Sequence, residues 1–185
     1  MATVVVPFRA GTAKRRLELP EHERVSVAHE MLDRVLTAAV AIGPTVLVTE
    51  AEAAFARGLA AGQGAAVVDD PGKGQGEAVL AGLAAVEEWP ALIVNADLPN
   101  AQPRDLLALL GAMPAEGMAI AGAEDGTTNA LAISRSALFA PLYGPDSAER
   151  FRAHAAAAGA DVVTLDVPAL AEDVDTVEEL DRLAS

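Results

Sequence analysis

VVVPFRAGTAKRRLELP, residues 4–20, decides the fold class at the start of the chain. Val4–Val6 is a short, continuous apolar run, as in a strand that is buried on both faces. Four of the chain's 13 Lys and Arg residues follow this strand within eight positions: Arg9, Lys14, Arg15 and Arg16. A loop with cations and Gly11 directly after a buried strand predicts a site for a chain of phosphates. A solvated basic patch is the alternative interpretation.

Outward from this stretch, short apolar runs alternate with helical patterns. Strands are predicted at Val4–Val6, Thr45–Val48, Ala65–Val68, Ala91–Val94, Met118–Ala121, Ala130–Ile133 and Val162–Leu165. Helices are predicted at Arg24–Ala41, Ala51–Ala61, Glu77–Glu87, Pro103–Met113, Ser147–Gly159 and Thr176–Leu183. The first four strands are continuous, which is typical of burial on both faces. This alternation predicts an α/β protein with a largely parallel sheet, formed as one domain over residues 1–185, with ligands at the carboxyl ends of the strands.

The composition narrows the class of protein. Apolar residues make up 52% of the 185 residues and aromatic residues 3%, which favours a helix-rich α/β protein over a β-sandwich. The formal net charge of −14 argues against binding to nucleic acid or to a membrane surface, because both are polyanions. The chain has no Cys and no apolar run long enough to span a membrane, which is typical of a cytoplasmic protein. The oligomeric state stays open, with a homodimer as one expectation.

A glycine-rich loop follows the third predicted strand, with the sequence DDPGKGQGEAV at residues 69–79. Its three glycines alternate with Lys73 and Gln75, and a helix is predicted from Glu77. Such a loop lets the backbone approach a phosphorylated or flat ligand, and Gln75 could bind a base edge. It lacks the spacing of a Walker motif, and a flexible turn explains it equally well.

Carboxylates occur at two further places in the sequence that could bind a metal ion. Asp97 follows the predicted strand in LIVNADLPN, residues 92–100, and Asp173 and Asp175 alternate on an extended segment before the last helix. Three carboxylates suffice to hold one or two Mg²⁺ ions, which prefer oxygen ligands. A helix N-cap is the alternative role for Asp97, although Pro103 marks a better helix start.

Two more segments offer small polar groups. GTTNALAI, residues 126–133, supplies two hydroxyls and an amide at the start of a strand, and YGPDSAER, residues 143–150, leads into a helix capped by Asp146 or Ser147. Free N–H groups at that helix start would attract a small anion. Ordinary turns and caps are the alternative. The three histidines have no metal-ligand spacing, and no serine-hydrolase motif is present.

Taken in order, six pieces of the chain resemble one family. They are VPFRAGTAKRRL, the ER of residues 23–24 with the helix after it, NADLP, GTTNAL, YGPDS and DVDT. The family is that of the 2-phospho-L-lactate/phosphoenolpyruvate guanylyltransferases of coenzyme F(420) biosynthesis. The resemblance implies a three-layer sandwich with a mostly parallel mixed sheet. It also implies a Rossmann-like nucleotidyltransferase fold, similar to that of nucleotide-diphospho-sugar transferases and of the molybdenum-cofactor guanylyltransferases.

The resemblance also implies roles for individual residues. Lys14 and Arg16 would grip the triphosphate of GTP and act in catalysis with Asp97. The nucleotide-binding set would be Pro7, Arg9, Lys14, Arg16, Asp70, Gly72, Gln75 and Gly76. Asp97, Asp173 and Asp175 would hold Mg²⁺. Thr128, Asn129, Gly144 and Ser147 would bind the phosphorylated three-carbon acid, whose phosphate would attack the α-phosphorus of GTP and release pyrophosphate.

The chain departs from the family pattern at two places. Gln75-Gly76 stands where the family often has Leu-Asn, which leaves open whether GTP or another nucleotide is used. Phe151 stands where the family tends to have a His, and His154 follows one helical turn later. Three acceptors stay open: phosphoenolpyruvate, 2-phospho-L-lactate and 3-phosphoglycerate. A nucleotide-binding regulator without catalysis is the alternative from a different class, and three carboxylates argue against it.

Overall fold

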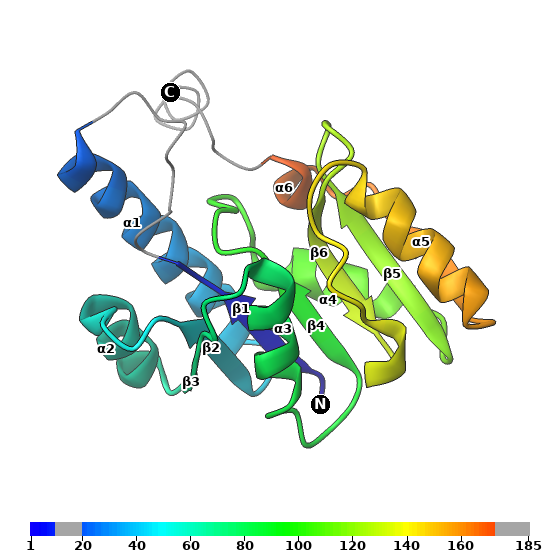
Figure 1. Ribbon diagram of the computed structural model, residues 1–185, viewed down its shortest axis with the longest axis horizontal. Coiled ribbons are helices and arrows are strands. Elements are labelled where there is room, and N and C mark those ends of the chain that lie inside the picture. Colours follow the sequence, from blue (N-terminus) through cyan, green and yellow to red (C-terminus); the bar gives the residue numbers. More distant parts are fainter. Residues whose placement is uncertain (10–19, 173–185) are drawn as a thin grey trace.

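The structure is a computed structural model, and it describes residues 1–9 and 20–172 (Figure 1). Within these residues seven strands form one sheet, in the order β3-β2-β1-β4-β6-β5-β7. The strands are β1 (Thr3–Pro7), β2 (Thr45–Thr49), β3 (Ala66–Asp69), β4 (Ala91–Val94), β5 (Gly117–Gly122), β6 (Thr128–Ile133) and β7 (Asp161–Thr164). The first strand of the chain therefore lies inside the sheet, between β2 and β4.

Of these seven strands, β6 runs against the others. It pairs antiparallel with β4 and β5, whereas β1, β2, β3 and β4 are parallel to one another and β7 is parallel to β5. Val94 at the end of β4 lies opposite Ala130 near the start of β6. The carboxyl edge of the sheet therefore gathers the ends of six strands and the beginning of β6. The predicted mostly parallel mixed sheet is confirmed.

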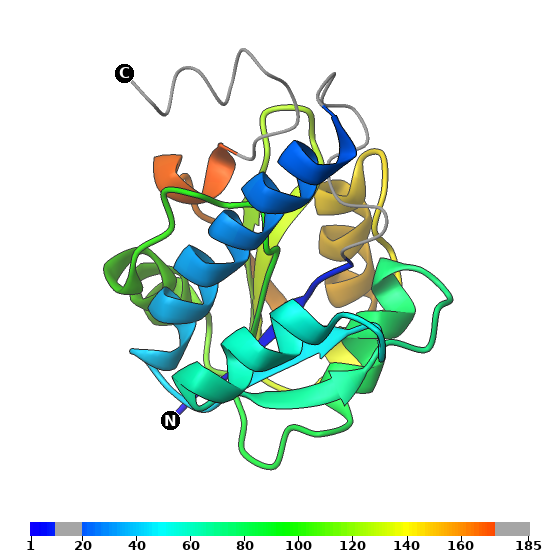
Figure 2. The same ribbon diagram turned by 90° about the vertical axis from the view of Figure 1, so that its left-hand side faces the viewer.

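Helices cover both faces of the sheet. They are α1 (Glu21–Val40), α2 (Ala54–Gln63), α3 (Gln75–Leu83), α4 (Pro103–Ala112), α5 (Ser147–Ala157) and α6 (Pro168–Ala171), with a 3-10 turn η1 (Ser136–Leu138). One buried core lies between the sheet and α1, α2, α4 and α6, and the other lies under α3, α5 and η1. Figure 2 shows the resulting three layers, with α4 and α6 to the left of the sheet and α3 and α5 to its right.

The sequence explains where the long helices form and end. In α1 the buried residues recur at helical spacing on one face, and they are Ala28, Met31, Leu32, Val35, Leu36, Ala38 and Ala39. Helix α4 begins at Pro103, and Gln102 and Asp105 exchange side-chain bonds with each other's backbone as a capping box. Gln102 is thus the N-cap of α4, so Asp97 does not cap this helix.

Several predicted elements differ from the structure, and α1 begins at Glu21, three residues before the predicted Arg24. β3 is an edge strand whose residues are exposed or half-buried, so the prediction that it is buried on both faces is wrong. Helix α2 starts three residues later than expected, and α3 spans Gln75–Leu83 rather than Glu77–Glu87. The turns η1 and α6 were not predicted.

The predicted helix at Thr176–Leu183 lies outside the described residues. No helix in the described part of the chain is long and apolar enough to cross a membrane.

Candidate active site

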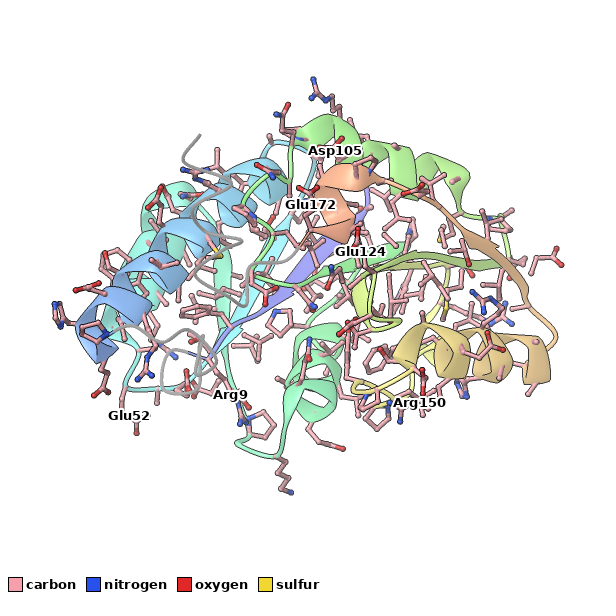
Figure 3. The ribbon with its side chains drawn as sticks, turned by 90° about the horizontal axis from the view of Figure 1, so that it is seen from above. Arg9, Glu52, Asp105, Glu124, Arg150 and Glu172 are labelled. Carbon is pink, nitrogen blue, oxygen red and sulfur yellow. The ribbon has the colours of Figure 1, made fainter. Side chains whose placement is uncertain are left out.

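Polar side chains from several elements lie along the carboxyl edge of the sheet. Arg9 follows β1, Asp70 follows β3 and Asn95 follows β4, while Thr128 begins β6 and Ser147 begins α5. Figure 3 looks down on this edge, with Arg9 at its lower left, Arg150 at its lower right and Glu124 and Glu172 farther up. Pro7, the buried last residue of β1, pairs in register with Val48.

Arg9 and Asp70 form a two-point ion pair that joins the loops after β1 and β3. Arg9 Nε donates to Asp70 Oδ2 at 2.5 Å, and Arg9 Nη2 donates to Asp70 Oδ1 at 2.9 Å. The Asp70 side chain is fully covered, whereas 27% of the Arg9 side chain stays exposed. The hydrogen bonds from Arg9 hold the pKa of Asp70 below its ordinary value, and Asp70 in turn raises the pKa of Arg9. The pair is therefore fixed and fully ionised at neutral pH.

The glycine-rich loop continues from Asp70 into α3. Asp70 Oδ1 also accepts a hydrogen bond from the Gly72 backbone N–H at 2.8 Å. Gly72 has a φ of 76° and Gly74, the N-cap of α3, a φ of 103°, which favour glycine at both positions. The covered carboxylate of Asp70 thus holds the backbone of this loop as well as Arg9.

Gly76 lies against the segment that leads to α5. A Cβ placed on Gly76 would come within 2.4 Å of the Pro141 Cβ and 2.7 Å of the Pro141 Cα, which is backbone. No larger side chain fits at this position without movement of Pro141. This contact gives a physical reason for glycine where the family often has Asn. It also brings the predicted nucleotide loop against the residues just before the predicted acid pocket.

A chain of side-chain amides crosses the carboxyl edge. Gln75 Nε2 donates to Asn95 Oδ1 at 2.7 Å, and Asn95 Nδ2 donates to the Thr128 carbonyl at 3.1 Å and to Asn129 Oδ1 at 3.4 Å. Asn129 Nδ2 then donates to the Leu170 carbonyl of α6 at 3.0 Å. Sequence reasoning missed Asn95, although the residue stands in the NADLP motif, because an Asn after a strand is also an ordinary turn residue.

The predicted acid pocket brings together three of its residues in the structure. Thr128 and Ser147 are buried, and the Ser147 hydroxyl donates to the Thr128 hydroxyl at 3.0 Å. The Ser147 N–H donates to the Gly144 carbonyl at 3.0 Å, and Gly144 has a φ of 112°. Asp146 is the N-cap of α5 but makes no side-chain cap bond. Asn129, the fourth predicted residue, is 2% exposed and bonds to α6 as described above.

The family described as "Guanylyl transferase CofC like" matches residues 2–184 of the chain. The chain belongs to this family. The resemblance seen in the six sequence pieces is thereby confirmed, and the protein is a CofC-like guanylyltransferase.

Curated relatives agree with this CofC-like assignment. The 2-phospho-L-lactate guanylyltransferase of Natrialba magadii is 37% identical over 194 residues, which cover 96% of this chain and 80% of the relative. The phosphoenolpyruvate guanylyltransferase of Sphaerobacter thermophilus is 35% identical over 195 residues, which cover 100% of this chain and 93% of the relative.

Solved structures at lower identity share the fold of the CofC-like guanylyltransferase. The CMP:2-keto-3-deoxy-manno-octonic acid synthetase complexed with CTP has a TM-score of 0.66 at 15% identity, covering 98% of this chain and 96% of that one. The glucosyl-3-phosphoglycerate synthase of Mycobacterium tuberculosis has a TM-score of 0.67 at 16% identity, covering 99% of this chain and 74% of that one. The predicted nucleotide-diphospho-sugar transferase-like fold is confirmed.

Five predicted site residues of the CofC-like guanylyltransferase remain, and the structure describes one of them. Asp97 lies three residues beyond the end of β4, and its Oδ1 atom is shielded from solvent. Lys14, Arg16, Asp173 and Asp175 lie outside the described residues. Within the described part of the chain, no group of three or more His, Cys, Asp or Glu side chains could hold a metal ion.

Proposed function

We propose that this guanylyltransferase joins GMP from GTP to phosphoenolpyruvate or 2-phospho-L-lactate in coenzyme F(420) biosynthesis, with phosphoenolpyruvate as the first choice. The observation that carries the proposal is the 35–37% identity, over nearly the whole chain, to relatives with those two activities. The alignment of the nucleotide loop and the acid pocket along one sheet edge supports it, because both substrates must meet there.

The proposed reaction needs positioning and charge neutralisation more than acid–base chemistry. An oxygen of the acceptor phosphate bonds to the α-phosphorus of GTP, and the bond from that phosphorus to the pyrophosphate oxygen breaks. The attacking oxygen is already anionic at neutral pH, so no side chain has to remove a proton. Holding the two phosphates in line then supplies a large part of the rate.

The predicted site residues divide between the two substrates in this proposal. The nucleotide is assigned to Pro7, Arg9, Lys14, Arg16, Asp70, Gly72, Gln75 and Gly76, and the acid to Thr128, Asn129, Gly144 and Ser147. Arg9 is bound to Asp70 through two of its nitrogens, so it acts by fixing the glycine-rich loop and presents only its remaining N–H groups to phosphate.

Mg²⁺ is assigned to Asp97, Asp173 and Asp175. The placed member of this set fits the role, because Asp97 puts a partly shielded carboxylate at the carboxyl edge beside the end of β4. A bound Mg²⁺ would offset negative charge on the phosphate oxygens. Lys14 and Arg16 would offset charge on the leaving pyrophosphate.

The decisive experiment measures pyrophosphate release with GTP, Mg²⁺ and each of phosphoenolpyruvate, 2-phospho-L-lactate and 3-phosphoglycerate. ATP and CTP serve as nucleotide controls, since Gln75-Gly76 departs from the family pattern. We expect release with GTP and phosphoenolpyruvate. If only 3-phosphoglycerate gave release, it would replace phosphoenolpyruvate as the proposed acceptor. If GTP bound tightly but no mixture released pyrophosphate, the protein would be a nucleotide-binding regulator rather than an enzyme.

A further inference from the structure

The proposed acceptors raise a charge problem at the acid pocket. Phosphoenolpyruvate and 2-phospho-L-lactate each carry a carboxylate beside the reacting phosphate, whereas Thr128, Asn129, Gly144 and Ser147 are all uncharged. The chain around them has a formal net charge of −14. Taking a carboxylate out of water is costly unless hydrogen bonds and an opposite charge compensate it, so a cation near this pocket would strengthen the binding of the acid beyond what the N–H groups at the start of α5 supply.

Arg150 is the cation that the structure places beside this pocket. It lies three residues after Ser147 in α5, and its Nη2 atom donates to the Tyr143 carbonyl at 3.0 Å. The same nitrogen lies 3.3 Å from the position that a Cβ on Gly144 would take. The guanidinium therefore folds back across Gly144, over the turn that leads into the helix. Figure 3 shows Arg150 at the lower margin of the molecule, beside the ribbon of α5.

Arg150 lacks the carboxylate partner that its sequence position offers. Asp146 stands four residues earlier, a spacing that normally forms ion pairs, but its Oδ1 atom lies near Gly126 instead. Glu149, its neighbour, pairs with Arg152. Among the described residues no carboxylate lies within ion-pair distance of Arg150, in contrast to Arg152 two positions on.

We propose that Arg150 binds the carboxylate of the acceptor acid and so selects phosphorylated acids over other phosphate esters. This inference rests on the proposed function. One N–H of the guanidinium holds the Tyr143 carbonyl, which fixes the group over Gly144. Its other N–H groups donate to no residue in the part of the chain that the structure describes, and in this proposal they bind the carboxylate. The uncharged pocket residues then bind the rest of the acceptor acid, and Arg150 supplies the positive charge that faces its carboxylate.

The test compares each acid with an analogue in which a methyl group replaces the carboxylate. Isopropenyl phosphate matches phosphoenolpyruvate, and isopropyl phosphate matches 2-phospho-L-lactate. For R150Q we expect kcat/KM for the acid to fall about 10- to 100-fold, the loss of a charged hydrogen-bonded contact. Activity with the methyl analogue and the KM for GTP should change little. The preference for the acid over its analogue should therefore fall by the same factor.

Two further variants separate binding from structure. R152Q, on the same helix, should keep the wild-type preference, and R150K should keep part of it because a charge remains. Equal losses of R150Q on acid and analogue would show that Arg150 only supports the turn, and would overturn the inference. If the wild type released pyrophosphate neither with phosphoenolpyruvate nor with 2-phospho-L-lactate, the proposed function would be overturned, and this inference with it.

Discussion

At the scale of single residues, the covered carboxylate of Asp70 holds together two loops of the proposed nucleotide site. It binds Arg9 through both oxygens and the Gly72 backbone through one of them. The first loop and the glycine-rich loop are far apart in sequence, and this carboxylate joins them. Part of the positive charge after β1, that of Arg9, thus holds two loops together.

Replacement of Asp70 by Asn should reveal this link in the pH dependence of stability. The folded-state pKa of Asp70 is below its ordinary value of 3.8, so the ionised group stabilises the fold above about pH 4. That contribution is lost as the pH falls through the lowered pKa. We expect the free energy of unfolding of D70N to be about 1.5–3 kcal/mol lower than that of the wild type at pH 7. In urea titrations this difference should shrink below pH 4.

D69N is the matched control, because Asp69 is 70% exposed and pairs with Arg57 at the surface. Its effect should stay under about 1 kcal/mol. A D70N variant as stable as D69N would contradict a structural role for the Arg9–Asp70 pair.

Substitution of Gly76 tests its close contact with Pro141. The added methyl group of G76A would meet the Pro141 Cα, which cannot move aside as a flexible side chain would. We expect a loss of about 1–3 kcal/mol in unfolding free energy, measured by thermal or urea unfolding. G58A in α2 is the control, since nothing lies within 4 Å of a Cβ there and the change should stabilise by about 0.5–1 kcal/mol. An unchanged G76A protein would mean that the turn adapts freely.

Asp97 is the described residue on which the metal assignment depends. D97N keeps the size of the side chain and removes its charge, so we expect turnover to fall by about 100-fold or more without a change in melting temperature. Mn²⁺ binding, followed by electron paramagnetic resonance, should weaken in parallel. Normal turnover in D97N would remove this residue from the metal site.

At the scale of elements, the amide chain from Gln75 to Leu170 ties α3, β4, β6 and α6 together across the sheet edge. Helix α6 has only four residues, and its place depends on contacts with the rest of the fold. Asn129 supplies such a contact from a buried position. The residue predicted to bind the acid is therefore also part of the support for α6.

N129A should measure that support. The variant leaves the Leu170 carbonyl without its side-chain donor, and we expect a loss of about 1–3 kcal/mol in unfolding free energy. N100A is the control, because the Asn100 side chain bonds to the exposed Glu172 side chain at 3.4 Å and not to a backbone group of α6. If N129A and N100A were equally stable in urea titrations, the bond to α6 would contribute nothing to folding.

Sequence patterns predicted the element types well where apolar runs are long. Ala91–Val94 was predicted with the bounds of β4, and the helix start at Pro103 was correct. The reversal of β6 could not be predicted, because an apolar run carries no direction. The exposure of β3 was missed because its position at the sheet edge depends on strand order. The partners of Gln75 and Asn129 likewise became visible only once the topology placed them.

At the scale of the whole molecule, the described residues pack as one unit. Two cores share the same sheet, and β1 contributes Val4 and Val6 to one of them and Val5 to the other. Residues from both ends of the described chain enter the same core, such as Val4 and Leu170. This packing supports the prediction of a single domain.

Coincident unfolding curves would test that prediction. Trp89, the single Trp of the chain, packs partly buried against the core under α3 and α5. Its fluorescence should therefore change with the far-ultraviolet circular dichroism in one urea transition. Two separated transitions would divide the chain into independently stable parts and contradict the prediction.

The central place of β1 has a consequence during synthesis on the ribosome. β1 is completed at Pro7, but β4, which pairs with it, is completed at Val94, roughly 90 residues later. At about 5–20 residues per second, the first strand waits roughly 4–18 s for that neighbour. An apolar strand with one open edge is a target for chaperones and for other nascent chains. The yield of folded enzyme should therefore depend on how well the cell shields the first seven residues.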